Sequence, residues 1–484
     1  MHTLLDALRH IVGAAHVFTD GDLTAWTQDW RRRATGTALA VVRPATTGEV
    51  AQVVKTCAEF LANNPTCGLS LVPQGGNTGL VVGSTPDASG QHIVLSLQRM
   101  NAVRALDADN LTMTVEAGCI LQNLQERAEA ANLLFPLRMA SEGTCTIGGN
   151  LGTNAGGTQV LRFGNARELC LGLEVVTAQG EVWQGLSGLR KDNTGYDLRH
   201  LLIGSEGTLG VITAATMKLF PLPAAQLTAW VAVPSLEQAV ALLGLAHRHL
   251  GAGLTGFEVM GQFALSLVAQ HFPQLPRPLA VDAPYFVLLE NSDHESEAHA
   301  RTQFEHLLEI ALNHGCAQDA VVAENLSQTR QLWHLRESIP LAQAKEGLNI
   351  KHDISIPVSA IPDFVRVTNA LLEAALPGVR GVTFGHLGDG NLHYNVQAPE
   401  GIDAAAFLRA HEAQVNTLVF DSVMAFGGSI SAEHGVGSLK VATLEKYKSP
   451  VALNMMRAIK QALDPHKLLN PGRVIQRAPT QPDA

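Results

Sequence analysis

Glycine-dense segments set the strongest limit on how the first half of this chain can fold. Three of them, PQGGNTG (73–79), SEGTCTIGGNLGTNAGG (141–157) and GSEGTLGVIT (204–213), interrupt an alternation of short strand-like and helix-like stretches. Glycine lets the backbone turn tightly, and successive small residues can point their N–H groups at one anion. The sequence has no Gly-Lys-Ser/Thr after these loops and no G-x-G-x-x-G after a strand, so neither a P-loop nor a Rossmann site is predicted. One such loop is usually only a turn, whereas three together favour contact with a phosphate.

Length and charge bound the class of protein. At 484 residues the chain is longer than one hydrophobic core usually supports, and 46% hydrophobic with 16% charged residues is the balance of a folded globular protein. A formal net charge of −10 argues against a nucleic-acid partner, because nothing would offset the phosphate charge. An acidic protein that binds a small anion has to gather cations locally, so a basic pocket is expected.

Cysteine usage and the N-terminus indicate the compartment. Six scattered cysteines include no C-x-x-C pair, which predicts buried free thiols in a reducing compartment. The N-terminal stretch has acidic residues and no basic segment before an apolar run, so it predicts an amphipathic helix and not a signal peptide. The sequence contains no run of eighteen apolar residues, so no membrane span is predicted and a cytoplasmic location is expected.

Periodicity and turn residues predict the main elements. Thr46 and Glu49 have the spacing of a capping box, and Gln179-Gly180 suits the turn of a hairpin. Gly315 ends a helical pattern, and prolines near residue 224 suggest a domain boundary. The predicted elements are a strand over 38–44, helices over 46–63, 120–134 and 295–315, and a hairpin over 171–183.

The stretch GHLGDGNLHYNV, residues 385–396, carries two histidines around a turn. Asp389-Gly390 is a favoured two-residue turn, and folding on it places His386 opposite His393. Opposed residues have Cβ atoms about 4.5–5.5 Å apart, so the two imidazoles can bind one divalent cation. Asn395 stays on the face of His393, while Tyr394 points the other way. The alternative is a pair of solvated or core histidines.

A metal ion would need a third ligand, and Glu433 in SAEHGVG is the best candidate. His434 follows it, and adjacent residues of an extended chain point to opposite faces. Gly435 and Gly437 can bend the chain and bring both side chains to one site. Two histidines and a glutamate with an open position form a known catalytic zinc set, with manganese or iron as alternatives.

Taken together, the motifs resemble a known family. VVRPATTGEVAQVV, PQGGNTG, IGGNLGTNAGG, LRKDNTGYDL and IGSEGTLGVIT are similar to the FAD-binding domain of vanillyl-alcohol-oxidase (PCMH-type) flavoproteins, from about Ala38 to Pro223. GHLGDGNLHYNV, SAEHGVG and LLNPGRV resemble the D-2-hydroxyacid dehydrogenase branch, which includes D-lactate, glycolate and, most closely, D-2-hydroxyglutarate dehydrogenases.

This resemblance implies where FAD would bind. The first loop would wrap the pyrophosphate through Pro73, Gly75, Gly76, Asn77, Thr78 and Gly79. The second would line the rest of the cofactor through Ser141, Gly143, Thr144, Gly148, Gly149, Asn150, Thr153, Asn154 and Gly156. The adenosine half would lie toward Glu206, Gly207 and Ile212, and the flavin ring toward Asn470. Some relatives attach FAD through a histidine in the first loop, and Gln74–Gly79 has none, so non-covalent FAD is predicted.

The resemblance also implies a metal site and a base. It places metal ligands at His386, His393 and Glu433, substrate contact at Asn395, and the general base at His434. Oxidation of an alcohol requires loss of the hydroxyl proton as hydride leaves carbon for flavin N5, and a neutral imidazole suits that role. A metal on the hydroxyl oxygen would lower its pKa. The alternatives for His434 are a fourth metal ligand or a residue that only supports the ligands.

A basic pocket is implied in WHLRESIPLAQAKEGLNIKHDISIP. Arg336 and Lys351 match positions where the hydroxyglutarate branch clamps the distal carboxylate. Alone, each would be read as a solvated surface cation. Those dehydrogenases carry a threonine where this chain has Pro340, which puts the dicarboxylate preference in question. Lys345, Lys351 or His352 could compensate.

The predicted fold class is α+β. A PCMH-type FAD-binding domain, an α+β substrate domain with an antiparallel sheet, and a mostly helical C-terminal segment are expected. The predicted bounds are 1–37 for an N-terminal helical segment, 38–224 for the FAD domain, 225–428 for the substrate domain and 429–484 for the C-terminal segment, whose residues 476–484 form a disordered tail.

The predicted activity is oxidation of a D-2-hydroxyacid, with D-2-hydroxyglutarate as the leading substrate. The alternatives are a D-lactate, glycolate or related monocarboxylate dehydrogenase, a zinc hydrolase whose glycine loops are structural, and a binding protein with an inactive site. The expected partners are a small anionic substrate, an electron acceptor such as electron-transfer flavoprotein or a quinone, and a second copy of the chain in a homodimer.

Overall fold

Two compact units make up residues 1–476, the part of the chain that the computed structural model describes. Unit 1 comprises Met1–Gly156, Asn165–Pro221 and the described chain from His434 onward. Unit 2 comprises Gly157–Gly164 and Leu222–Glu433.

All six cysteines are free and five of them are buried, as predicted. None of the described helices is long and apolar enough to cross a membrane. The disordered tail was predicted to begin at residue 476, and residues 477–484 lie outside the described part.

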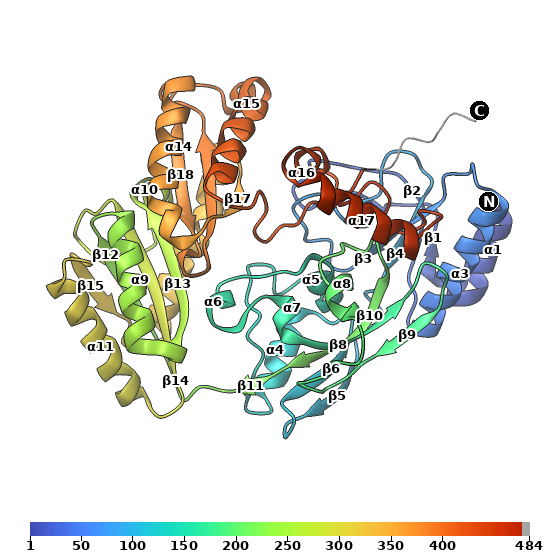
Figure 1. The fold of residues 1–484 in the computed structure, drawn as a ribbon, viewed down its shortest axis with the longest axis horizontal. Helices are drawn as coiled ribbons and strands as arrows, with labels where there is room; N and C mark the ends of the chain where they lie inside the picture. Colours follow the sequence, from blue (N-terminus) through green and yellow to red (C-terminus); the bar gives the residue numbers. More distant parts are fainter. Residues whose placement is uncertain (477–484) are drawn as a thin grey trace. The chain divides into compact units, whose positions relative to one another are not determined.

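Unit 1 contains two larger sheets of different type (Figure 1). The four-stranded sheet has the order β1-β2-β4-β3, in which β2, β4 and β3 run parallel. The five-stranded sheet has the order β5-β6-β10-β8-β9 and is antiparallel throughout, and β7 pairs with β11. The strands are β1 (Val17–Phe18), β2 (Ala38–Val42), β3 (Ser70–Gln74), β4 (His92–Ser96), β5 (Val103–Asp107), β6 (Thr112–Glu116), β7 (Leu133–Leu134), β8 (Cys170–Val176), β9 (Val182–Gly185), β10 (Val211–Lys218) and β11 (Phe220–Pro221).

Helix α3 (Thr47–Asn63) shows how the sequence sets local structure in unit 1. The Thr46 side chain accepts a hydrogen bond from the Glu49 backbone N–H at 3.1 Å, which confirms the predicted helix start. Such a cap stabilises a helix by about 1 kcal/mol. The buried side chains from Val50 to Leu61 belong to the core of the parallel sheet, where α3 packs beside α1 (Figure 1). The helices of unit 1 are α1 (His2–Val12), α2 (Thr24–Thr27), α3, α4 (Leu121–Glu129), α5 (Ile147–Thr153), α7 (Ala166–Leu169), α8 (Leu198–Leu202), α16 (Val441–Tyr447) and α17 (Pro450–Leu463).

One predicted helix is too long, and one predicted hairpin is confirmed. The helix predicted over 120–134 ends at Glu129, because Asn132 has a φ of 59° and the two leucines after it pair with β11. The hairpin predicted over 171–183 forms with Val176 opposite Val182, and Gly180 at its turn has a φ of 80°.

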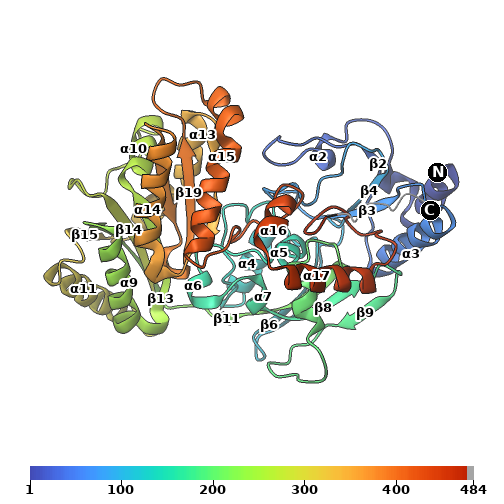
Figure 2. The same ribbon diagram turned by 45° about the horizontal axis from the view of Figure 1, so that its top comes forward.

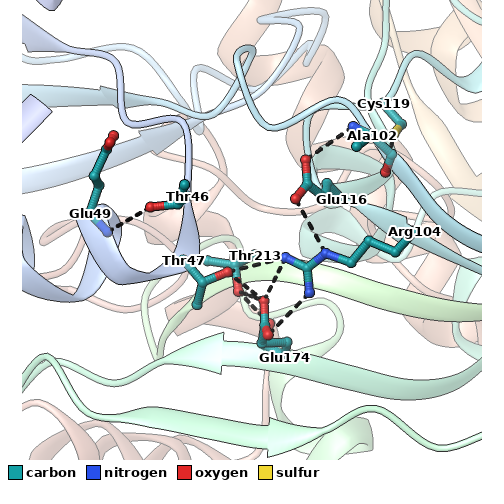
Figure 3. A network of polar contacts seen from close by, with 9 residues as sticks. All are labelled: Thr46, Thr47, Glu49, Ala102, Arg104, Glu116, Cys119, Glu174 and Thr213. Atoms are coloured by element: carbon teal, nitrogen blue, oxygen red, sulfur yellow. Dashed lines mark hydrogen bonds and ion pairs between the residues drawn. The ribbon is translucent and has the colours of Figure 1, made fainter.

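A buried carboxylate ties the antiparallel sheet of unit 1 to helix α3 (Figure 3). Glu174 on β8 is 4% exposed, and it accepts hydrogen bonds from Arg104 Nη1 and Nη2 at 3.2 and 3.1 Å. Its Oε1 also accepts bonds from the hydroxyls of Thr47 and Thr213 at 2.5 and 2.9 Å. Arg104 Nε donates to Glu116 at 3.2 Å. Burial raises the pKa of Glu174, but Arg104 and the two hydroxyls outweigh it and hold this pKa below its usual value.

Unit 2 is built on one eight-stranded antiparallel sheet, which confirms the predicted α+β arrangement. Its order is β15-β12-β14-β13-β18-β19-β16, with β17 also paired to β19. The strands are β12 (Ala225–Val233), β13 (Leu254–Gly261), β14 (Tyr285–Asp293), β15 (Asp319–Val322), β16 (Asn349–Ile350), β17 (Asp353–Ser355), β18 (Arg380–Gly385) and β19 (Asn391–Gln397).

Helices cover this sheet in separate groups. α10, α12 and α13 share an apolar core with β12, β13, β14 and β18 that includes Trp230, Met260 and Phe384. α9 and α11 lie side by side along β12 (Figure 1), and α14 lies beside α15 (Figure 2). The predicted helix before Gly315 is confirmed as α11. The helices of unit 2 are α6 (Val160–Phe163), α9 (Leu236–Leu250), α10 (Gln262–His271), α11 (Glu297–Asn313), α12 (Leu326–Glu337), α13 (Ile339–Glu346), α14 (Ile361–Ala375) and α15 (Ala404–Ala425).

Candidate active site

The first two glycine segments of unit 1 lie against each other. A Cβ atom on Gly75 would come within 2.2 Å of Thr146 Oγ1, and one on Gly76 within 2.2 Å of the Thr144 carbonyl oxygen. Only glycine fits at either position, because the obstructing atoms are a buried side chain and backbone. Gly148 is also closely packed, since its Cβ would lie 2.6 Å from that of Ala117. The loop that follows β3 is therefore held directly on the segment that begins α5.

Buried polar atoms around these segments fit a nucleotide cofactor. Thr146 Oγ1, Asn150 Oδ1, Gln74 Oε1 and Asn470 Oδ1 are buried and have no hydrogen-bond partner among the described residues. Buried polar atoms in folded proteins are almost always hydrogen-bonded to protein, water or ligand. Glycine backbone beside four such atoms provides both the space and the hydrogen-bonding groups that FAD requires.

Two of the residues that were predicted to bind FAD, Asn77 and Asn154, have side chains that form hydrogen bonds within the protein. Asn77 Nδ2 donates to the carbonyl oxygens of Ala25 and Gln28, and Asn154 Oδ1 accepts from the Arg167 N–H at 3.0 Å. Both asparagines adopt the left-handed conformation, with a φ of 52°. Their side chains thus fix the loops, which leaves the loop backbone as the part that can face a ligand.

The other residues that were predicted to bind FAD lie in different elements of unit 1. The Thr153 hydroxyl donates to Gly149 O within α5, and Ile212 is a buried residue of β10. A Cβ on Gly207 would lie 3.2 Å from Pro73. The segment with Ser141, Gly143 and Thr144 forms a turn that is closed by a 2.9 Å bond from the Thr144 N–H to Ser141 O, and Thr78, Gly79 and Gly156 complete the two loops.

Glu206 and Asn470 join three of the sequence motifs. The Glu206 carboxylate accepts hydrogen bonds from the backbone N–H groups of Val436 and Gly437, both at 2.7 Å. Asn470 Nδ2 donates to Glu206 O at 2.8 Å and to Gly83 O at 2.9 Å. Burial raises the pKa of Glu206 against the effect of the two N–H groups. The SAEHGVG loop is thereby anchored two residues after His434.

In unit 2, the predicted register of the histidine hairpin is wrong. His393 pairs with Phe384 and not with His386, so the turn is longer than Asp389-Gly390. His386 lies outside the ladder, and a short 3₁₀ turn over Leu387–Asp389 follows it. The side chain of Leu387, in this wider turn, is fully buried. The two imidazoles still meet, with ring centroids 5.8 Å apart.

The wider turn brings His386 to a buried carboxylate. His386 Nδ1 contacts Glu258 Oε1 at 2.5 Å, and Arg336 Nε donates to Glu258 Oε2 at 2.7 Å. The side chain of Glu258 is fully buried, and those of His386 and Arg336 are 10% and 8% exposed. A carboxylate only accepts, so Nδ1 of His386 carries its proton and Nε2 is the nitrogen left for a metal.

The predicted metal ligands converge on that nitrogen. One ligand atom from each of His386, His393 and Glu433 lies within 4.8 Å of the others, and His386 Nε2 lies 3.5 Å from Glu433 Oε1. The Glu433 backbone N–H donates to Asp353 Oδ2 at 3.0 Å, which positions this glutamate. Two imidazole nitrogens and a carboxylate oxygen within such a distance fit a zinc, manganese or iron ion.

Charge in this cluster shifts the protonation of its members. Burial lowers the pKa of His386, but Glu258 and Glu433 outweigh it and raise this pKa to about 9. Burial raises the pKa of Glu433 to about 7 despite the nearby His386. Burial also opposes ionisation of Glu258, but His386 and Arg336 lower its pKa to about 2. Glu258 is thus the permanent anion between two basic side chains.

The predicted substrate residues lie at different depths. The Arg336 guanidinium lies over the Phe384 ring, 4.9 Å from its centroid, and that ring is 4.9 Å from the His393 ring. The buried Asn395 amide bonds to the His352 N–H and to Gln343, on the face of β19 that also carries His393. The Lys351 side chain is exposed.

The residues proposed to compensate for Pro340 have other contacts. Both ring nitrogens of His352 are engaged, by Tyr394 O at 2.8 Å and Asn416 Oδ1 at 2.9 Å. Lys345 Nζ lies 4.1 Å from the centroid of Phe272. Pro340 itself stands in the first turn of α13.

Two residues of this cluster were missed in the sequence. Glu258 lies 128 positions before His386 along the chain, and Asp353 lies 80 positions before Glu433. Glu258 lies in no recognised motif, whereas Asp353 lies in the segment of the predicted basic pocket, two residues after Lys351, and was given no role. One signal was present, because Glu258 interrupts the apolar run FEVM, and a charged residue among core-facing strand positions indicates a buried partner.

Comparisons with known proteins decide the family. The family model described as FAD linked oxidases, C-terminal domain, matches residues 222–474, and the FAD binding domain model matches residues 38–185. D-2-hydroxyglutarate dehydrogenase of Xanthomonas citri pv. viticola is 40% identical over 98% of this chain and 98% of its own. The chain belongs to the FAD-linked D-2-hydroxyacid dehydrogenases. It is also similar to the mitochondrial D-2-hydroxyglutarate dehydrogenases of Bos taurus, at 37% identity over 97% of this chain and 83% of that one, and of Arabidopsis thaliana, at 36% over 96% and 80%.

Solved structures confirm the fold of this dehydrogenase. p-Cresol methylhydroxylase with substrate bound superposes with a TM-score of 0.75 at 16% identity, covering 98% of this chain and 97% of that one. Alkyldihydroxyacetonephosphate synthase gives a TM-score of 0.71 at 16% identity, covering 97% and 84%. The predicted PCMH-type fold is therefore confirmed, and the FAD domain establishes FAD as the cofactor.

Proposed function

We propose that this dehydrogenase oxidises D-2-hydroxyglutarate to 2-oxoglutarate with non-covalent FAD and a divalent metal ion, zinc being the expected ion. The observation that carries the proposal is one cluster in unit 2, where three possible metal ligands lie together and one of them, His386, contacts a buried arginine through Glu258. The near full-length similarity to proteins named D-2-hydroxyglutarate dehydrogenase supports the same substrate.

FAD would be held by the two glycine loops and by the unpartnered polar atoms around them. When bound, FAD supplies the acceptor, at N5, for the hydride that leaves the substrate carbon. Gly75 and Gly76 exclude side chains from the cradle, while Thr146 and Asn150 offer hydrogen bonds to the cofactor. Gln74–Gly79 contains no histidine, which supports non-covalent attachment.

The metal would be held by His386, His393 and Glu433. When bound, a divalent ion stabilises developing negative charge on the substrate hydroxyl oxygen and lowers its pKa. Glu258 holds His386 in the tautomer that presents Nε2, and Asp353 holds the backbone of Glu433. Such outer contacts orient metal ligands in known metalloenzymes.

His434 would take the hydroxyl proton. It follows the proposed ligand Glu433 directly, and Glu206 anchors the backbone two residues after it. A neutral imidazole at this place can accept a proton near neutral pH. Transfer of electrons to an electron-transfer flavoprotein or a quinone, a homodimeric assembly and a cytoplasmic location remain part of the proposal.

Arg336 and Lys351 would bind the distal carboxylate. Arg336 has its Nε bonded to Glu258, so the guanidinium is oriented before any substrate arrives. Pro340 favours a second candidate, a D-lactate or related monocarboxylate dehydrogenase, because it removes the hydroxyl donor of the hydroxyglutarate branch. In that case the cations would have no second carboxylate to bind.

A substrate panel tests the proposal. Purified FAD-loaded protein is assayed with D-2-hydroxyglutarate, D-malate, D-lactate and glycolate and an artificial dye acceptor, before and after chelation. We expect kcat/KM to be highest for D-2-hydroxyglutarate and activity to return when zinc is added back. Equal kcat/KM values for D-lactate and D-2-hydroxyglutarate would rule out that Arg336 and Lys351 bind a distal carboxylate. Full activity in demonstrably metal-free protein would remove the metal from the proposal.

A further inference from the structure

Glu258 occupies an unusual place between two parts of the proposed site. It stands on β13, where register neighbours Val259 and Met260 pair with Gly385 and Phe384 at the start of the histidine turn. Its side chain is fully buried, with one oxygen on His386 and the other on Arg336.

The two contacts of Glu258 depend on each other. One carboxylate has a single plane, so a rotation that improves the bond to Arg336 Nε changes the bond to His386 Nδ1. The guanidinium is held over Phe384, whose ring contacts His393. Contacts therefore connect the two histidines in the order His386, Glu258, Arg336, Phe384, His393. Packed interiors transmit such displacements because they contain few voids.

We propose that Glu258 is a positioning residue that couples the metal site to the substrate-carboxylate site. It orients the histidine that would bind the metal and the arginine that would bind the distal carboxylate, so occupancy of one site tunes affinity at the other. This inference rests on the proposed function, because it requires both ligands to bind in this cluster.

A purely structural role makes different predictions. A carboxylate that only neutralises two buried cations would stabilise the fold, and its removal would lower stability without separating metal affinity from substrate affinity. A positioning role changes the dissociation constant for zinc, and it raises KM for a dicarboxylate more than KM for a monocarboxylate.

The test compares Glu258→Gln with Glu290→Gln. Glutamine keeps the volume of Glu258 but has an N–H₂ group in place of one oxygen, and since the two partners contact different oxygens, one of them would face a donor. Glu290 is a matched control: it is 5% exposed, lies on the neighbouring strand β14 and accepts bonds from Gln226 at 2.7 Å and Thr255 at 2.8 Å. The zinc dissociation constant of chelated protein is measured by calorimetry, and KM is measured for D-2-hydroxyglutarate and D-lactate at saturating zinc.

We expect Glu258→Gln to weaken zinc binding by about 10- to 100-fold, the usual effect of losing a residue that orients a metal ligand. KM for D-2-hydroxyglutarate should rise at least several-fold more than KM for D-lactate, and Glu290→Gln should match the wild type in both. Zinc affinity and KM that are unchanged in Glu258→Gln would overturn the inference.

A second variant covers the case in which Glu258→Gln does not fold. Arg336→Lys keeps the positive charge, loses the Nε contact and alters no metal ligand, so coupling through Glu258 predicts a zinc dissociation constant raised by a few-fold. An unchanged constant in this variant would overturn the coupling. Failure of the proposed function looks different: wild-type protein would then bind no zinc, or would oxidise D-2-hydroxyglutarate equally well without it.

Discussion

Replacing Glu174 with glutamine should weaken unit 1, and the loss should depend on pH. The carboxylate accepts two bonds from Arg104 and one from each of two threonine hydroxyls. An amide keeps one acceptor oxygen, loses the charge and turns an N–H₂ group toward one guanidinium nitrogen. The perturbation therefore abolishes the ion pair, keeps at most one of the two hydrogen bonds from the guanidinium and weakens the other contacts.

The magnitude follows from how the pair is buried. Removing one member of a buried ion pair costs about 3–5 kcal/mol. The Arg104 side chain is 30% exposed and retains Glu116 at 3.2 Å, so its charge is partly solvated in the variant. The lower end applies, and Glu174→Gln should reduce the free energy of unfolding by about 3 kcal/mol.

Glu116→Gln is the matched control. It removes a carboxylate from the same arginine, but this side chain is 15% exposed and contacts Arg104 through a single 3.2 Å bond. Its loss should cost at most about 1 kcal/mol. Both variants are compared in urea titrations of FAD-loaded protein, followed by far-UV circular dichroism and by the rise in flavin fluorescence when FAD leaves unit 1.

The pH dependence gives the sharper result. The folded pKa of Glu174 lies below its ordinary value of 4.5, so its stabilisation is fully present above that pH and is lost as pH falls through the lowered pKa. The difference in unfolding free energy between wild type and Glu174→Gln should therefore shrink below pH 4.5. A difference that stays constant with pH, or equal losses in both variants, would refute the reasoning.

Four further outcomes are expected. Gly76→Ala should lose FAD, seen as missing absorbance near 450 nm, because the new Cβ would lie 2.2 Å from a carbonyl oxygen, whereas Gly152→Ala meets nothing within 4 Å and should keep it. His393→Ala should lose bound zinc, measured by elemental analysis of the purified protein, and unchanged zinc content would contradict its role as a ligand. His434→Ala should keep FAD and zinc but lower kcat by about 10²- to 10⁴-fold in the dye assay. Adding zinc to chelated protein at about 100 times its dissociation constant should stabilise the fold by about 2.7 kcal/mol, seen as a shift of the unfolding transition in urea.

Local elements were predictable where a short segment decides its own structure. The Thr46 cap and the Gln179-Gly180 turn depend on residues within a few positions, and both are confirmed. The helix predicted to reach residue 134 failed because its last leucines pair with a strand more than eighty residues away. Tertiary pairing outweighed helical periodicity there, and the sequence window contains no trace of the partner.

The histidine turn shows the same limit within the candidate site. The spacing of His386 and His393 predicted two neighbouring imidazoles, and their rings do lie close. The register was wrong because buried Leu387 and the contact of His386 with Glu258 favour a wider turn over the two-residue one. Glu258 belongs to a distant strand, so the side chain that decides the orientation of this turn was invisible to local patterns.

The path of the chain between its units has a consequence for how such a protein can evolve. Gly157–Gly164, which follows the second glycine loop, belongs to unit 2, where α6 packs on β13 and Leu161 lies beside Gly388. A gene fragment for Leu222–Glu433 alone would encode the sheet without this helix. Recombination at one junction near residue 222 would therefore not transfer either unit as a complete unit, because each unit is built from more than one segment of the chain. The two units of this enzyme are expected to be inherited together, with new substrates arising by point substitution and not by domain exchange.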